Sequence, residues 1–265
     1  MNVNLWLKKT KEEIDALDAE LLVLEILHEK ERSFLVANDN IELNQNDLDV
    51  LDRLVKLRKR GMPLAYIVGR KEFYGREFAV DRNVLIPRPE SEEIIEIVKS
   101  LKLKEPKILD VGTGSGCLAI TLALEIEKSK VVAADISKEA LKVAAENAVD
   151  LGARVEFVES DLLEKFQDEK FDVVVANLPY VDETWDWLSE ELEWEPEKAL
   201  FAVDEGLYEI KRLIDEVDKY KNTEYLVIEA DESQHEKIKK YIGKKKSLEV
   251  VKTSGFQILA KKSPR

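Results

Sequence analysis

The stretch ILDVGTGSGCLAI (residues 108–120) joins an apolar strand to a helix through the turn Gly112-Thr113-Gly114-Ser115-Gly116. Glycines lack a Cβ and accept positive φ, so such a turn lets a ligand approach bare backbone and the N–H groups that begin a helix. The spacing GxGxG differs from the dinucleotide pattern GxGxxG. Taken alone, the string is also compatible with an ordinary tight turn. The surrounding sequence must therefore show whether it binds a ligand.

Strands and helices alternate around this turn. Apolar strand patterns occupy residues 107–111, 131–135, 154–160, 172–177 and 225–230, with helical patterns between most of them, and two last strands cover 247–253 and 256–262. Alternation of this kind implies βαβ units, a mostly parallel sheet and an α/β fold. Only Ser254-Gly255 separates the last two strands, which predicts an antiparallel hairpin at the sheet edge.

Residues 1–62 follow a helical pattern instead. Leucines recur at spacings of three and four, as at Leu21 and Leu24, which is typical of the apolar face of a helix. A second helical run begins after Asn46-Asp47, which suit an N-cap, and stops at Gly61. The sequence therefore predicts a small helical bundle at the N-terminus.

Residues 63–90 change character again. They show little helical periodicity, contain many β-forming residues, and are interrupted by Gly69, Gly75 and Pro87. This composition predicts a β-hairpin linker between two domains. We therefore expect the bundle, then this linker, then an α/β domain over residues 91–265.

Composition limits the classes of protein. No apolar run approaches the roughly 18 residues of a membrane helix, and the N-terminus lacks a signal-peptide core. The single cysteine, Cys117, fits a reducing compartment, so we expect a cytoplasmic protein. The formal net charge of −14 argues against direct nucleic-acid binding, although the basic clusters at 56–60 and 237–246 remain. His28 and His235 have no ligand-like neighbours, so we expect no metal site.

Three polar residues mark the ends of the strands after the glycine turn. They are Asp135, Asp161 and Asn177. In doubly wound sheets ligands bind outside the carboxyl ends of the strands, where a carboxylate accepts ribose hydroxyls. Asp135 suits a ribose, and Asp161 suits an adenine amine with Leu162 against the ring, but each also suits a helix N-cap. Together with Gly112 they predict a nucleoside-binding cleft.

These motifs resemble a known family. The GxGxG turn, the two strand-end aspartates and the tetrapeptide Asn-Leu-Pro-Tyr (177–180) look like a class I S-adenosylmethionine-dependent methyltransferase. The segment YIVGRKEFYGREFAVDRNVLIPRPESEE (66–93) closely resembles the domain junction of the HemK/PrmC family, the protein-(glutamine-N5) methyltransferases that act on peptide chain release factors. EPEKAL from Glu195 and DEGL from Asp204 resemble that family too.

The resemblance implies a fold and a reaction. The fold is a class I methyltransferase Rossmann-like sheet with a C-terminal antiparallel hairpin, preceded by a helical bundle that docks the substrate. The reaction is N5-methylation of the glutamine in the Gly-Gly-Gln loop of a release factor, by a monomer that uses S-adenosyl-L-methionine and releases S-adenosylhomocysteine. The implied cofactor-binding residues are Gly112, Thr113, Gly114, Ser115, Gly116, Asp135, Ile136, Asp161, Leu162 and Asn177.

The tetrapeptide carries the expected catalysis. The side-chain carbonyl of Asn177 and the backbone carbonyl of Leu178 can accept both hydrogens of an amide NH2, which orients its nitrogen for in-line methyl transfer. Pro179 restricts Leu178 to an extended backbone and holds its carbonyl outward, and Tyr180 offers a flat face with a hydroxyl at its rim. An Asn-x-Pro turn that simply leaves the sheet is the other interpretation.

Three departures from the family pattern keep other functions open. Leu178 replaces a proline, Ala202-Val203 replace a glycine-rich piece, and Asp231 replaces a glycine. Asn-Leu-Pro-Tyr is also typical of rRNA adenine dimethyltransferases, so an adenine N6-methyltransferase acting on rRNA or DNA is the alternative, with the flipped base stacked on Tyr180. A cofactor-binding protein without activity is the third hypothesis.

Overall fold

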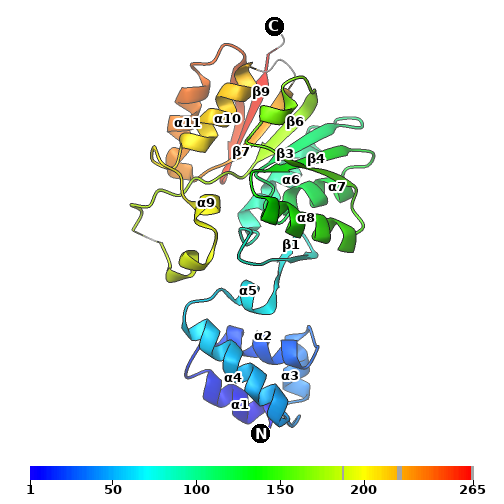
Figure 1. Cartoon of the computed structure of the whole chain (residues 1–265), viewed down its shortest axis with the longest axis vertical. Coiled ribbons are helices and arrows are strands. Elements are labelled where there is room, and N and C mark those ends of the chain that lie inside the picture. The colour runs from blue at the N-terminus through cyan, green and yellow to red at the C-terminus, as the bar shows by residue number, and fades with distance from the viewer. Residues whose placement is uncertain (187, 220–222, 264–265) are drawn as a thin grey trace. The chain divides into compact units, whose positions relative to one another are not determined.

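The computed structural model describes residues 1–186, 188–219 and 223–263, and the chain divides into two units. The smaller unit contains Met1–Arg70 and Ser189–Trp194, and the larger contains Lys71–Leu188 and Glu195–Arg265 (Figure 1).

The smaller unit is helical. Its helices are α1 (Val3–Thr10), α2 (Ala16–Ile26), α3 (Arg32–Ala37), α4 (Gln45–Lys59) and α5 (Leu64–Val68), with the 3-10 turn η3 (Glu190–Trp194). The expected cap of the second helical run is wrong by two residues. Asn44 caps α4, because its side chain accepts from the N–H of Asp47 while the Asp47 carboxylate accepts from the N–H of Asn44. This reciprocal box satisfies two backbone donors at the start of α4.

Helix α5 lies in the stretch for which the sequence predicted only β structure. Pro63, with φ of −54°, precedes it, and Gly69, with φ of +74°, ends it, so the prolines and glycines that suggested a linker also bound a short helix. The hairpin that follows is limited to β1 (Arg70–Phe73) and β2 (Arg76–Ala79). Phe73 and Phe78 pack edge to face, and both are buried in the core of the larger unit.

The larger unit is built on a seven-stranded sheet. Its strands are β3 (Lys107–Val111), β4 (Lys130–Asp135), β5 (Val155–Glu159), β6 (Phe171–Ala176), β7 (Thr223–Glu229), β8 (Leu248–Ser254) and β9 (Gln257–Lys262), in the order β5-β4-β3-β6-β7-β9-β8. Strands β3 to β7 are parallel, and β9 is antiparallel to both β7 and β8. The predicted α/β sheet with an antiparallel C-terminal pair is confirmed, and β9 is inserted beside β7 while β8 forms the edge.

Helices cover both faces of this sheet (Figure 1). They are α6 (Glu92–Ser100), α7 (Cys117–Glu125) and α8 (Lys138–Asp150) on one face and α10 (Tyr208–Lys219) and α11 (His235–Ile242) on the other, with the short α9 (Glu197–Leu200) and the 3-10 turns η1 (Pro89–Ser91), η2 (Glu164–Phe166) and η4 (Glu232–Gln234) in connections. Along β6, Val173 and Val175 face the α6–α8 core, while Val174 and Ala176 face the α10–α11 core.

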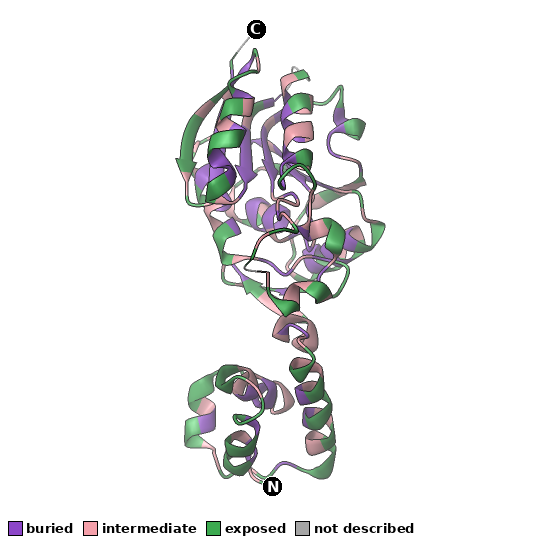
Figure 2. Ribbon diagram, turned by 90° about the vertical axis from the view of Figure 1, so that its left-hand side faces the viewer, coloured by how far each residue is buried: buried purple, intermediate pink, exposed green. Residues whose placement is uncertain are grey.

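Because both faces are covered, the inner parallel strands β3, β4, β6 and β7 are largely apolar, whereas the outer strand β5 contains the exposed Glu156 and Glu159. Figure 2 shows buried residues concentrated on the strands and exposed residues on the outer sides of the helices. Within the described residues, no helix is long and apolar enough to cross a membrane.

Candidate active site

A cavity of about 620 Å³ opens at the carboxyl ends of the parallel strands in the larger unit. Most of the predicted site residues meet in its wall, namely Gly112, Thr113, Gly114, Ser115, Asp135, Ile136, Asp161, Leu162, Asn177, Leu178 and Pro179. Gly116 and Tyr180, both described by the structure, lie outside this wall. The sheet therefore gathers residues that are up to 67 positions apart, Gly112 to Pro179, at one edge.

The glycine turn needs its glycines for two different reasons. Gly112, Gly114 and Gly116 all have positive φ, at +74°, +54° and +81°. A Cβ on Gly112 would lie 3.0 Å from Cδ2 of Leu178, so the turn and the tetrapeptide are in direct contact. A Cβ on Gly116 would lie 2.9 Å from Ile120 Cδ1 and 3.0 Å from Ala144 Cβ, so Gly116 allows α7 and α8 to pack closely.

Asp110, which the sequence reasoning missed, holds this turn from beneath. It is fully buried, and its Oδ2 accepts from Thr113 Oγ1 at 2.6 Å and from the Ala119 N–H at 3.2 Å. Its Oδ1 has no hydrogen-bond partner among the described residues. Burial raises the pKa of Asp110 to about 7. The signal for it was a carboxylate two residues before the first glycine of the turn.

Asp135 keeps both carboxylate oxygens at the cavity. Oδ2 accepts from the Gly114 N–H at 2.9 Å and Oδ1 from the Ser137 N–H at 2.8 Å, and burial raises its pKa. The cap of α8 is Ser137, whose side chain accepts from the Ala140 N–H. Asp135 is therefore not the helix cap that the sequence left open, and each oxygen retains lone pairs for a ligand.

Asp161 pairs with a cation that the sequence reasoning missed. Its Oδ2 accepts from Arg212 Nη2 at 2.8 Å, and Arg212 also binds Glu209. The hydrogen bond to Asp161 contributes most to raising the pKa of Arg212. The neighbouring Leu162 is buried and has a φ of +44°, which turns the chain beneath the cavity.

Asn177 is oriented by a serine far away in the sequence. Its Nδ2 donates to Ser91 Oγ at 2.9 Å, and Ser91 is buried at the start of α6. With Nδ2 committed to Ser91, Oδ1 is the one acceptor that this amide offers in the cavity wall.

Ser91 in turn contacts a buried carboxylate at the end of β7. Glu229 is fully buried and accepts hydrogen bonds from Ser91, from the Tyr180 hydroxyl at 3.3 Å and from Gln257 Nε2 at 3.3 Å. Burial raises the pKa of Glu229 to about 7. Ala176 pairs with Ile228, so Glu229 stands beside Asn177 at the sheet edge. In the sequence, Glu229 could have been recognised as one more polar residue at the end of a predicted strand, like Asp135 and Asn177.

The backbone of Tyr180 is held separately. Its carbonyl accepts from Gln234 Nε2 at 2.8 Å, and the same amide donates to the Glu205 carbonyl at 2.9 Å. A Cβ on Gly206 would lie only 2.0 Å from the Tyr180 carbonyl oxygen. Asp204, Glu205 and Gly206 all have positive φ, so the DEGL motif is a tight loop that presses against the tetrapeptide.

Two other motifs bind each other beside the cavity. Arg88 of the IPRPE segment pairs with Glu195 of EPEKAL, and Glu195 also accepts from the Ile86 N–H at 3.0 Å. Glu195 is buried while the Arg88 side chain is 31% exposed, so this half-buried ion pair ties the segment before α6 to the loop after β6.

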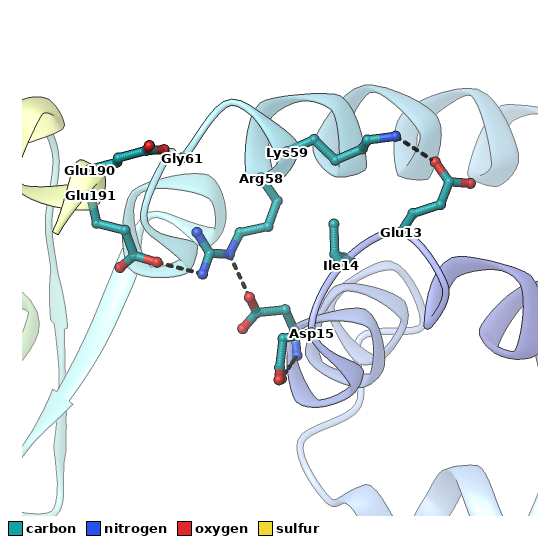
Figure 3. Close-up of a pocket in the computed structure, with 9 residues that line it drawn as sticks. Glu13, Ile14, Asp15, Arg58, Lys59, Gly61, Glu190 and Glu191 are labelled. Atoms are coloured by element: carbon teal, nitrogen blue, oxygen red, sulfur yellow. Dashed lines mark hydrogen bonds and ion pairs between the residues drawn. The ribbon is translucent and has the colours of Figure 1, made fainter.

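A second hollow, of about 420 Å³, lies in the smaller unit (Figure 3). Arg58 binds Asp18 and Glu191 at 2.5 Å each, and Lys59 binds Glu13 at 2.9 Å. The Arg58–Glu191 pair fastens the 189–194 segment to α4, and the other two pairs join α4 to residues 13–18 within this unit. The charged side chains of this hollow largely pair with one another. The larger cavity, in contrast, offers oxygens with free lone pairs.

The larger cavity suits a nucleoside ligand with a positively charged substituent. It combines an open glycine turn with the Asp135 carboxylate at the carboxyl ends of the strands. No group of three or more His, Cys, Asp or Glu side chains that suits a metal ion occurs among the described residues.

Comparison with known families gives two matches. Residues 5–69 match the family described as PrmC N-terminal domain, and residues 93–191 match the methyltransferase small domain. The release factor glutamine methyltransferase of Koribacter versatilis is 44% identical over 206 residues, which are 76% of this chain and 73% of that relative. The enzymes of the same description from Bacillus subtilis and Neisseria gonorrhoeae are 44% and 39% identical, covering 71% and 80% of this chain and 68% and 78% of theirs.

Solved structures share the fold. The ribosomal protein L11 methylase of Lactobacillus delbrueckii aligns with a TM-score of 0.51 and 23% identity over 70% of this chain and 84% of its own. The T. thermophilus 16S rRNA N2 G1207 methyltransferase, in complex with AdoMet and guanosine, aligns with a TM-score of 0.53 and 14% identity over 74% of this chain and 50% of its own. At these identities the likeness shows the class I methyltransferase fold alone.

Proposed function

The chain belongs to the release factor glutamine methyltransferase family, and we propose that it methylates the N5 nitrogen of the glutamine in the Gly-Gly-Gln loop of a peptide chain release factor. The resemblance that the motifs indicated is thereby confirmed. One observation carries the residue-level proposal. The Asn177 amide lies in the cavity wall, donates its N–H to Ser91, and so keeps Oδ1 as an acceptor beside the glycine turn.

S-adenosyl-L-methionine is the methyl donor, and it supplies an electrophilic methyl group on a positively charged sulfur and leaves as S-adenosylhomocysteine. We assign its ribose to the Asp135 carboxylate and its adenine to Asp161, Leu162 and the exposed side of Ile136. Gly112 and Gly114 leave the backbone bare where the ligand approaches. Gly116 contributes through helix packing, as its contacts with Ile120 and Ala144 indicate.

The tetrapeptide receives the glutamine. A glutamine amide is a weak nucleophile, since its nitrogen lone pair is delocalised into the carbonyl. Hydrogen bonds from both N–H groups to Asn177 Oδ1 and to the Leu178 carbonyl fix the nitrogen and favour the pyramidal geometry of the transition state. Because the second acceptor is a backbone atom, the leucine that replaces the family's proline preserves it. No side chain is assigned to proton removal, because the methylated nitrogen becomes acidic enough to release its proton to water.

The sequence suggested that Tyr180 offers its ring face and its hydroxyl to the substrate, but the structure gives this side chain other partners. Its hydroxyl binds Glu229 and its ring packs against the α10–α11 core. We therefore assign it to holding the tetrapeptide, while the ring edge remains close to the substrate stem.

The test is a methylation reaction on a whole release factor. Purified chain, S-adenosylmethionine and a recombinant bacterial release factor are incubated, and the Gly-Gly-Gln peptide is sequenced by mass spectrometry. We expect one added methyl group on the glutamine and none with a Gln→Ala release factor. With the Asn177→Ala enzyme we expect the rate of methylation to be strongly reduced.

An RNA substrate in a parallel reaction decides the adenine alternative. The proposal fails if the chain binds the cofactor by calorimetry, leaves the release factor unmethylated and produces N6-methyladenine. The three named relatives, all described as glutamine enzymes, favour glutamine. The proposal is completed by a cytoplasmic monomer that docks the release factor through residues 1–62. It does not bind nucleic acid directly, which the net charge of −14 supports.

A further inference from the structure

A buried carboxylate joins the two polar side chains of the tetrapeptide. Glu229 accepts directly from the Tyr180 hydroxyl, and it reaches Asn177 through Ser91. Ser91 is 2% exposed and Glu229 is fully buried, so water does not compete for these hydrogen bonds. Gln257, which is 1% exposed, donates to Glu229 and to the Glu90 carbonyl at 2.8 Å, and so fixes the carboxylate from the β9 side.

The direction of each hydrogen bond in this chain follows from the carboxylate. While Glu229 is ionised, its carboxylate only accepts, so the Ser91 hydroxyl must donate its single hydrogen to Glu229. Ser91 Oγ is then left with lone pairs, and these can only accept from Asn177. The Asn177 amide must therefore present Nδ2 to Ser91, which sends Oδ1 the other way.

We propose that Glu229, acting through Ser91, is a positioning residue for methyl transfer that selects the orientation of the Asn177 amide. The inference rests on the proposed function, since the oriented Oδ1 is the acceptor for the substrate nitrogen. Without the carboxylate, the Ser91 hydroxyl is free to donate to Asn177 Oδ1, and the amide turns its NH2 group toward the substrate. Two NH2 groups facing each other repel, so the substrate nitrogen loses its alignment.

Two substitutions separate positioning from packing. Glu229→Gln keeps the shape but adds an NH2 group among the donors Ser91, Tyr180 and Gln257, and Ser91→Ala removes the intermediate hydroxyl. For each we expect kcat to fall on the order of 10- to 100-fold, as for a misaligned reacting group, with cofactor affinity unchanged. The matched control is Ser247→Ala. Ser247 is also 2% exposed and donates to a carboxylate, Asp218, but at the start of β8, so its loss should leave kcat unchanged.

A second readout does not depend on activity. The side-chain NH2 signal of Asn177 in the nitrogen–hydrogen NMR spectrum of the full chain is identified by its loss in Asn177→Ala. In the wild-type protein we expect its hydrogens to exchange slowly with water, and in Glu229→Gln and Ser91→Ala to exchange on the order of 10-fold faster. Ser247→Ala should leave this exchange rate as it is.

The outcomes are distinct. If the wild-type chain does not methylate a release factor, the proposed function fails, while the NMR measurement still decides the orientation of Asn177. If Glu229→Gln does not fold, Ser91→Ala decides by itself. Folded variants that keep both kcat and the slow exchange of Asn177 would overturn the positioning role and leave Glu229 as a packing residue.

Discussion

The two halves of the cavity edge, the glycine turn at 112–116 and the tetrapeptide at 177–180, are held in place in different ways. The turn is held locally. Asp110 binds Thr113 and Ala119, three and nine residues away, and the positive φ values are intrinsic to glycine. The tetrapeptide is held from a distance, by Ser91, which is 86 residues from Asn177, and by Glu229 and Gln234, which are 49 and 54 residues from Tyr180.

Because the two halves are held differently, cofactor binding by the glycine turn and methyl transfer at the tetrapeptide should depend on different residues. A cofactor site made of local backbone persists wherever the strand, turn and helix form. The tetrapeptide is oriented only when β7, α6 and η4 have packed around it, and buried polar groups of this kind are costly when a partner is lost. Substitutions in distant residues should therefore impair methyl transfer while leaving cofactor affinity intact, and substitutions near the turn should do the reverse.

The largest effect is expected for Asn177→Ala. It removes the side-chain acceptor of the substrate nitrogen but no part of the glycine turn, so kcat should fall on the order of 100- to 1000-fold, as when one oriented hydrogen bond to a transition state is removed. Calorimetry with S-adenosylhomocysteine should give an affinity close to that of the wild type. A large loss of cofactor affinity would contradict the separation of the two halves.

Gly206→Ala should have the next largest effect. The new Cβ would lie 2.0 Å from the Tyr180 carbonyl oxygen, so the tetrapeptide must shift, and kcat should fall on the order of 10- to 100-fold. Gly152→Ala is the matched control. Gly152 also has positive φ, at +68°, but a Cβ there would meet nothing within 4 Å, so only the backbone strain of about 1 kcal/mol remains. Equal rates in the two variants would show that DEGL does not hold the tetrapeptide.

The same difference explains how far the sequence predicted the site. The turn, Asp135 and Asn177 were predictable because a strand followed by a glycine turn is local, and the ends of parallel strands meet at one edge. Ser91 lies in the junction motif and Gln257 in the last strand. Their contacts with Asn177 and Glu229 form only when these elements pack beside β6 and β7 in the folded sheet, so the sequence did not indicate these particular roles. Tyr180 was expected in the cavity, but its hydroxyl is drawn to Glu229, whose burial the sequence did not reveal.

The fold shows the same limit. The apolar runs located each strand to within a residue or two, because both faces of the sheet are covered. Helix α5 was missed, since five residues between Pro63 and Gly69 are too few to show helical periodicity. The cap of α4 was misplaced because three asparagine or aspartate residues, at 44, 46 and 47, are all chemically suited to it.

Asp135→Asn tests the other half of the comparison. An asparagine has one oxygen for two backbone donors, Gly114 and Ser137, so its NH2 group faces either an N–H or the ligand. We expect cofactor affinity to fall about 10-fold, as for one lost hydrogen bond to a charged group, with kcat at saturating cofactor much less affected. Asp172→Asn is the control, because Asp172 likewise accepts from a backbone N–H, that of Lys107, at the opposite end of the sheet.

The smallest effect concerns stability and pH. Burial raises the pKa of Glu229 to about 7 from its ordinary value of 4.5, so between these values the folded protein holds a proton that the unfolded chain has released. The contribution of Glu229 to the free energy of unfolding therefore falls as pH rises through this range, and the penalty is complete above about pH 7. Gln cannot titrate, so the stability of Glu229→Gln relative to the wild type should increase from about pH 5 to about pH 8.

Urea midpoints of the two proteins across this range measure the difference. Asp110 has a similarly raised pKa but is present in both proteins, so its titration largely cancels in the difference. A difference that is flat with pH, or that declines, would mean that Glu229 keeps an ordinary pKa in the folded state. An increase, combined with slower methyl transfer by the same variant, would mean that the ionised carboxylate lowers stability at the place where it orients Asn177.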